Sequence, residues 1–166
     1  MTLNLATAAF FTALVEFALG IGMLTLWSRE GRKYLIYWSS GFFTFGFGSF
    51  LISMRGKIPD FFSIIFANLS TTLSSILFFI GICIFFNRRR SGVAWMVAML
   101  CLEGALLAYY TYAMYDTQAR VYVYSAAQAL IVLMTLWMLA KVRRERRESS
   151  NPEIVAVTLL FLLVHS

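Results

Sequence analysis

The chain has 166 residues, of which 60% are hydrophobic and only 13% are charged, and its mean hydropathy is +0.76. A soluble domain of this length cannot cover so much apolar surface in one core, so the composition predicts a protein whose solvent is lipid. The net charge of +6 lies in short runs between apolar segments, which favours topology signals and contact with the lipid bilayer over nucleic-acid binding.

Five apolar segments are long enough to cross a bilayer, for which a helix needs roughly 20 residues. Helices satisfy their own backbone hydrogen bonds in hydrocarbon, so the chain is predicted to be an all-α, polytopic membrane helix bundle. We expect it to form a single module over residues 1–166. The expected spans are 5–27, 34–54, 61–86, 93–115 and 119–140, followed by an incomplete sixth at 153–166.

The first span places an acidic residue on a face of small residues. Ala9, Ala13, Glu16 and Gly20 follow steps of four, three and four, so they share one side of a helix. Small residues let helices approach closely in a membrane. This stripe is therefore expected to pack on a neighbouring helix and to direct Glu16 into the bundle.

The second span also carries small residues, with Gly41 and Gly48 on one face. Close helix packing is the expected reason, and a ligand groove is the alternative. The connection that follows contains Pro59 and Asp60, which predict a helix start with Asp60 as its N-cap.

A polar stripe is predicted on the third span, because four polar residues lie at offsets of zero, three, four and seven. Interhelical packing is one interpretation, since Ser and Thr can bond to their own helix backbone. The fifth span adds Ser125 and Gln128, so a polar pocket between these two helices is the alternative. The third-span residues are Asn68, Thr71, Thr72 and Ser75.

The fourth span contains a second acidic residue near its middle, Glu103. Glu16 and Glu103 each lie 11 residues from the same predicted side of the bundle, which puts both about 16 Å deep. Two carboxyls at one depth would form a proton- or cation-sensing site if they meet. Alternatively, each is a neutral acid that holds helices together through hydrogen bonds.

No catalytic or metal-binding set is evident in the sequence. Cys83 and Cys101 both lie inside apolar segments, which favours core or lipid-facing positions over a disulfide or metal site. We therefore expect no cofactor and no metal, and a chain that is not itself an enzyme.

Basic residues predict the orientation. Eleven lie in the first, third and fifth connections, in the runs 29–33, 88–90 and 141–147, against three in Arg55, Lys57 and Arg120. The first set is therefore expected in the cytoplasm and the N-terminus outside. The sixth segment would then run outward, so we expect a longer parent protein with seven spans before any cytoplasmic domain.

The stretch 34–90 resembles the multi-span sensor region that precedes GGDEF-type diguanylate cyclase domains in bacteria. The resemblance implies a sensory or anchoring module of the bacterial inner membrane with a periplasmic N-terminus, which regulates cyclic di-GMP synthesis and acts with a homodimer partner or a cytoplasmic signalling partner. The chain has no Gly-Gly-Asp-Glu-Phe run, so no catalytic residue is implied. The residues that carry the likeness are Trp38, Gly41, Phe45, Gly48, Arg55, Gly56, Pro59, Asp60, Ser63, Ile64, Ala67, Asn68 and Gly81.

Two other functions remain open at this point. One is a small proton- or cation-coupled transporter that uses Glu16 and Glu103 as its acids, although no inverted repeat and no Pro-broken span are evident. The other is a membrane scaffold or assembly protein. In each case the sequence leaves the small-molecule ligand unknown.

Overall fold

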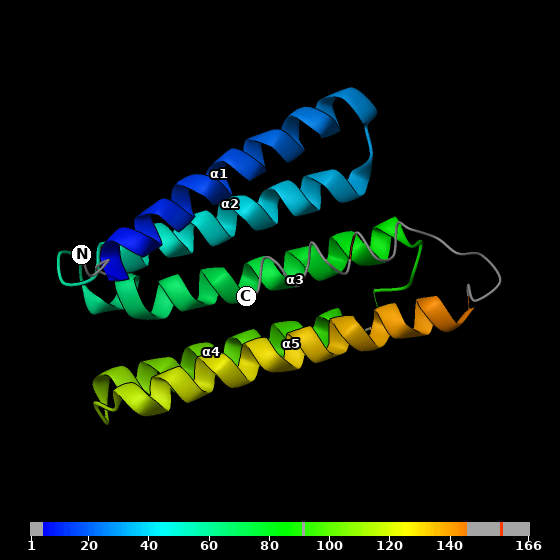
Figure 1. Cartoon of the computed structure of the whole chain (residues 1–166). Helices are drawn as coiled ribbons and strands as arrows, with labels where there is room; N and C mark the ends of the chain where they lie inside the picture. Colours follow the sequence, from blue (N-terminus) through cyan, green and yellow to red (C-terminus); the bar gives the residue numbers. More distant parts are fainter. Residues whose placement is uncertain (1–4, 91, 146–156, 158–166) are drawn as a thin grey trace.

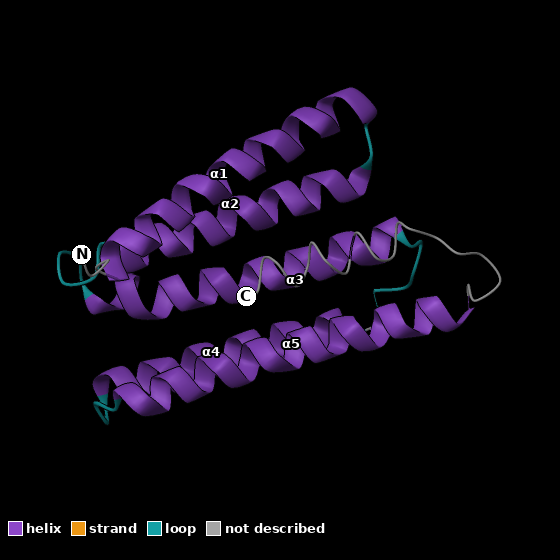
Figure 2. Ribbon diagram, in the orientation of Figure 1, coloured by secondary structure: helices purple, strands orange, loops and turns teal. Residues whose placement is uncertain are grey.

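The computed structural model describes residues 5–90, 92–145 and 157, and these residues form a bundle of long helices (Figures 1 and 2). Consecutive helices run antiparallel, as their short connections require. In chain order the elements are α1 (Leu5–Glu30), α2 (Lys33–Ser53), the π-helical turn η1 (Phe61–Phe66), α3 (Ala67–Phe85), α4 (Val93–Tyr112) and α5 (Thr117–Glu145).

Among the described residues, five helices are long and apolar enough to cross a membrane. The prediction of an all-α, multi-pass membrane protein with five complete spans is therefore confirmed at this level. The predicted sixth segment, 153–166, lies outside the described residues apart from Val157, which is buried. The observed spans are Leu5–Glu30, Lys33–Ser53, Phe61–Phe85, Val93–Tyr112 and Thr117–Arg144.

The start of the third span differs from the prediction. Asp60 occupies the N-cap position, but its side chain accepts no capping hydrogen bond from the described part of the chain. Instead, the carbonyl of Pro59 accepts hydrogen bonds from the backbone N–H groups of Phe62 and Ser63 at 3.0 and 3.2 Å. The turn that follows is π-helical and α-helical geometry begins only at Ala67, so local backbone bonding replaces the expected side-chain cap.

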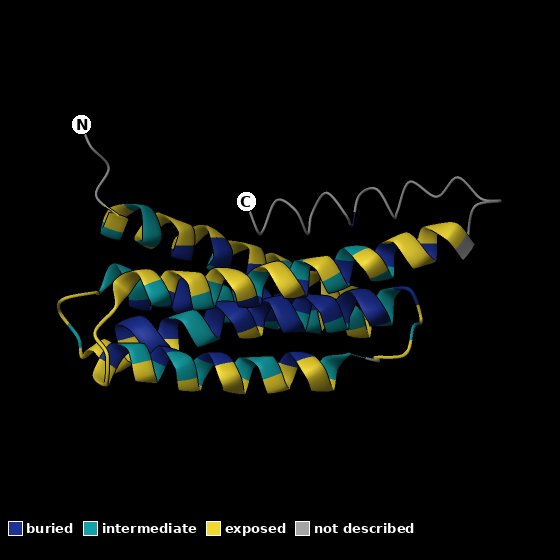
Figure 3. Cartoon of the chain, turned by 90° about the horizontal axis from the view of Figure 1, so that it is seen from below, coloured by how far each residue is buried: buried dark blue, intermediate teal, exposed yellow. Residues whose placement is uncertain are grey.

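The third span is the centre of the bundle. In its most apolar stretch 61% of the residues are buried, against 17% in α1 and in α4. The helix α1 packs on α2, α2 packs on α3, and the hairpin of α4 and α5 contacts α3 from its other side. In Figure 3, seen from below, buried residues concentrate along the middle of the bundle. Every other span therefore packs either against α3 or against a helix that contacts α3.

Small residues join α1 to α2 as expected. The buried residues of α1 are Ala13, Glu16 and Gly20, while Ala9 of the predicted stripe is half-buried. A Cβ atom added at Gly20 would lie 3.2 Å from the ring of Phe43 on α2. The Ser39 hydroxyl of α2 donates a hydrogen bond to the Gly20 carbonyl at 2.8 Å, so a polar contact accompanies the close approach.

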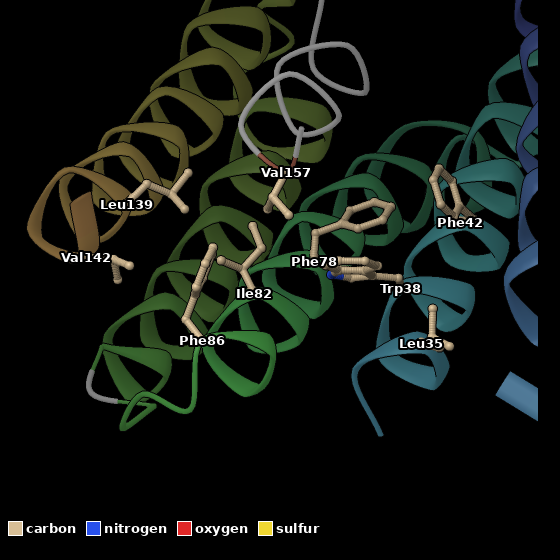
Figure 4. Packing of buried hydrophobic residues seen from close by; sticks show 9 residues of the cluster. All are labelled: Leu35, Trp38, Phe42, Phe78, Ile82, Phe86, Leu139, Val142 and Val157. Atoms are coloured by element: carbon tan, nitrogen blue, oxygen red, sulfur yellow. The ribbon is translucent and has the colours of Figure 1, made fainter. Parts of the chain in front are cut away.

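The contact between α2 and α3 is closer still. A Cβ atom at Gly48 would lie 2.8 Å from the carbonyl oxygen of Ala67, and one at Gly41 would lie 3.1 Å from the Phe78 ring. On α3, Gly81 packs directly against the indole of Trp38. A cluster of buried apolar residues packs α2, α3 and α5 together (Figure 4): Leu35, Trp38, Phe42, Phe78, Ile82, Phe86, Leu139, Val142 and Val157.

One end of the bundle is strongly basic. The α1–α2 connection, the α3–α4 connection and the last turns of α5 all lie there (Figure 1). We call it the basic end, and its described cations are Arg29, Arg32, Lys33, Arg88, Arg89, Arg90, Lys141, Arg143 and Arg144.

Replacing Gly48 by Ala should destabilise the fold, because the added methyl group meets backbone rather than a flexible side chain. Overpacking of this kind costs roughly 1–3 kcal/mol, which exceeds the gain of up to about 1 kcal/mol that Ala brings to a helix. The control is Gly22→Ala on α1, where an added Cβ meets nothing within 4 Å. Thermal unfolding in detergent should show a lower midpoint for Gly48→Ala and an equal or higher midpoint for Gly22→Ala.

Candidate functional site

Glu103 lies on the inner face of α4, near the middle of the span. The buried residues of this helix are Met96, Glu103, Leu107 and Thr111, whose spacings of seven, four and four place them on one stripe. Only 2% of Glu103 is exposed. The same stripe that supplies apolar contact to α3 therefore carries a carboxyl into the bundle.

A chain of hydrogen bonds between α3 and α5 leads to this carboxyl on α4. The Ser75 hydroxyl of α3 donates to Gln128 Oε1 of α5 at 3.0 Å. Gln128 Nε2 donates to Thr72 Oγ1 of α3 at 3.2 Å, and Thr72 Oγ1 donates to Glu103 Oε1 of α4 at 3.1 Å. We call these four residues the Glu103 network. Its bonds all point toward Glu103, so each donor is used in a consistent direction.

The predicted polar stripe of α3 contributes only in part. Thr72 and Ser75 are three residues apart and face the hairpin, whereas the Asn68 amide donates to the Ile64 carbonyl of its own helix at 2.7 Å. The Thr71 hydroxyl likewise bonds to the Asn68 carbonyl at 2.7 Å. Both side chains thus bond to backbone carbonyls of the third span, and the Thr71 side chain also lies beside Tyr124 of α5.

On α5 one predicted residue joins the network and the other does not. Gln128 enters it, whereas Ser125 is exposed on the outer side of the helix. Tyr124 is a polar residue of this region that the sequence pattern did not single out, and it lies beside Thr71 and Gln128. Its position four residues before Gln128, on the same helix face, was the available signal.

Glu103 is best described as a neutral carboxylic acid. It forms no ion pair with any described residue, and an ionised carboxylate at this depth would cost at least a few kcal/mol. Its Oε2 atom is buried and has no hydrogen-bond partner among the described residues. Oε1 accepts from Thr72, so Oε2 is the oxygen of this carboxyl that a proton or a polar ligand could still engage.

The structure does not bring Glu16 to Glu103. Glu16 is 8% exposed, and its Cβ lies 3.2 Å from where a Cβ of Gly46 on α2 would stand. In Figure 1, α2 and α3 separate α1 from α4. Like Glu103, Glu16 has a buried Oε2 that finds no partner in the part of the chain that the structure describes. The hypothesis of one shared proton or cation site therefore has no geometric support.

The described residues offer no group of His, Cys, Asp and Glu that could hold a metal ion. Cys83 and Cys101 are free thiols, the first buried and the second exposed. The Glu103 network itself offers two hydroxyls, one amide and one carboxyl.

The chain matches no protein-family model, no curated protein and no solved structure. The resemblance to sensor regions of diguanylate cyclases consequently stays a prediction from the sequence.

Replacing Thr72 by Val should weaken the fold, because one isosteric change removes the donor to Glu103 and the acceptor of Gln128. Interhelical hydrogen bonds in membranes contribute roughly 1–2 kcal/mol at most, so we expect a loss of about that size. The control is Thr135→Val, since the buried Thr135 hydroxyl bonds only to the Ile131 carbonyl of its own helix among the contacts described. Equal losses in unfolding free energy for both variants would contradict the role given to Thr72.

Proposed function

We propose that this chain is a multi-pass membrane sensory and anchoring module, non-catalytic itself, in which the α4–α5 hairpin is the part that responds. The observation that carries the proposal is the difference between the two sides of α3. On one side, α2 packs against both α1 and α3 through glycines that lie close to backbone carbonyls of those helices. On the other side a hydrogen-bond chain ending at Glu103 joins the hairpin to α3.

This difference has a physical consequence in lipid. Apolar side chains gain little by leaving lipid for one another, so close packing and polar bonds decide which helices stay together. Across the interface between α3 and the hairpin, an added Cβ at Gly104 on α4 would meet only the side chain of Leu69 on α3. The Glu103 network is therefore the most specific connection between α3 and the hairpin, and its rearrangement would release the hairpin while α1–α3 remain joined.

The same geometry connects the network to the basic end. Gln128 lies on α5, which continues as one helix to Glu145. A displacement of the hairpin would thus be carried rigidly to Lys141 and the residues after it. With the basic end in the cytoplasm, as the distribution of Lys and Arg favours, the signal would arise within the bilayer and be read inside the cell.

The parent protein that stretch 34–90 favours is a diguanylate cyclase of the bacterial inner membrane, with this module as its regulatory region and its N-terminus in the periplasm. In that setting the hairpin would change the position of an output domain or of a partner chain. The signal would be a proton, a small molecule or a property of the lipid that reaches the Glu103 network from within the membrane.

A proton- or cation-coupled carrier is the competing function, favoured by the unpartnered buried Oε2 atoms of Glu16 and Glu103. A carrier would need a path between these acids or from each to both surfaces. Their separate interfaces make the sensory function the better supported of the two.

Pulsed electron paramagnetic resonance in nanodiscs tests the proposal. Spin labels at the exposed positions Ile36 on α2 and Leu133 on α5, with Cys83 and Cys101 replaced, report the distance from the hairpin to the α1–α3 unit. The double variant Thr72→Val, Gln128→Leu should broaden or shift this distance distribution, because it removes all three interhelical bonds of the network.

Two controls accompany this measurement. Labels at Leu19 and Ile36 report the α1–α2 distance, which should not change, and Thr135→Val should leave both distances unchanged. An α2–α5 distance that is insensitive to loss of the network would overturn the sensory proposal. Proton flux in proteoliposomes that disappears in Glu103→Gln would establish the carrier instead.

A further inference from the structure

The basic end contains a groove of about 270 Å³ between the end of α3 and the last turns of α5. Its polar rim is formed by Arg88, Arg89 and Lys141, and Met134, Trp137 and Met138 contribute to its apolar wall. No acidic side chain is among the described residues that line it. One groove thus combines concentrated positive charge with an apolar surface that continues toward the membrane.

The end of α3 determines where the arginines stand. Asn87 adopts a left-handed conformation with φ of 53°, and the Arg88 N–H donates to the Cys83 carbonyl at 2.7 Å. This is the Schellman arrangement, in which the residue after the left-handed position bonds back into the last helical turn. It reverses the chain so that Arg88 and Arg89 line the same groove as α5.

The opposite wall is amphipathic. The Lys141 Nζ lies 5.7 Å from the centroid of the Trp137 ring, and Trp137 is 69% exposed. Tryptophan and lysine at a helix end are typical of the headgroup level, where an apolar stem and a charged tip are both accommodated. Met138 and Met134 precede Lys141 by three and seven residues, so they extend the wall from the headgroup level into the hydrocarbon.

We propose that this groove binds one anionic phospholipid, with its phosphate between Arg89 and Lys141 and an acyl chain along Met134 and Met138. Basic pockets between membrane helices suit such headgroups, and flexible methionines adapt to an irregular chain. The inference rests on the groove alone and does not depend on the sensory function. Because the lipid would contact both α3 and α5, it would join the two helices at the basic end.

Native mass spectrometry of the full chain in a neutral detergent tests the site, with phosphatidylglycerol as the probe and phosphatidylcholine as the reference lipid. Arg89→Gln with Lys141→Gln should weaken phosphatidylglycerol binding by roughly 30-fold, because each basic residue near a membrane surface contributes about fivefold. The matched control is Arg143→Gln with Arg144→Gln, which removes the same charge from exposed residues of α5 outside the groove and should weaken binding by less than about fivefold.

Two further measurements distinguish a lipid site from diffuse charge attraction and from a plain phosphate site. Lys141→Arg should preserve binding, since it keeps the charge at the groove. Glycerol phosphate should compete far less well than short-chain phosphatidylglycerol, because it cannot use the apolar wall. Equal losses in the two double variants would show diffuse attraction only, and equal competition by glycerol phosphate would show a phosphate site without a lipid chain; either result overturns the proposal. All four mutated residues are exposed, and unchanged unfolding midpoints would verify that the variants remain folded.

Discussion

The whole bundle depends on the contacts of α3, which must bind the neighbouring helices in a lipid environment as apolar as their own side chains. Lipid offers no hydrophobic driving force for helix association, so only close contact and polar bonds distinguish one neighbour from another. The helix uses both. Its first side receives α2 so closely that Gly48 could not carry a methyl group without moving the Ala67 carbonyl, and its second side donates through Thr72 to a carboxyl on α4.

These two kinds of contact respond differently to change. A packed glycine interface has one arrangement and loses contact as soon as it shifts, whereas a hydrogen-bond chain can break, reverse or accept water and form again. The chain places the Glu103 carboxyl in the second kind of interface, where a proton or a polar ligand can alter the bonding, and the Glu16 carboxyl in the first. The sensory function proposed above would use both kinds of contact on one central helix, the first to keep the bundle assembled and the second to respond.

Much of the arrangement could be predicted from local patterns. The lengths of the apolar segments predicted the five spans, and the steps between Ala13, Glu16 and Gly20 predicted the face that α1 buries. The bonding of single side chains was harder to predict. Asn68 and Thr71 belong to the same polar stripe as Thr72, yet both bond to backbone carbonyls of the third span, because a helical hydroxyl or amide always has its own backbone as a competing partner. The expected Asp60 cap failed for a similar reason, since the Pro59 carbonyl takes over the first N–H groups.

The sequence by itself determined the class of the protein, the number of complete spans and the polar residues of each helix, because lipid constrains length and composition along a single segment. Only the tertiary structure decided which faces meet. Equal depth suggested that Glu16 and Glu103 are neighbours, but depth is one coordinate, and the order of helices around α3 supplies the other two. That order assigns Glu16 to the α1–α2 contact and Glu103 to the network of α3, α4 and α5.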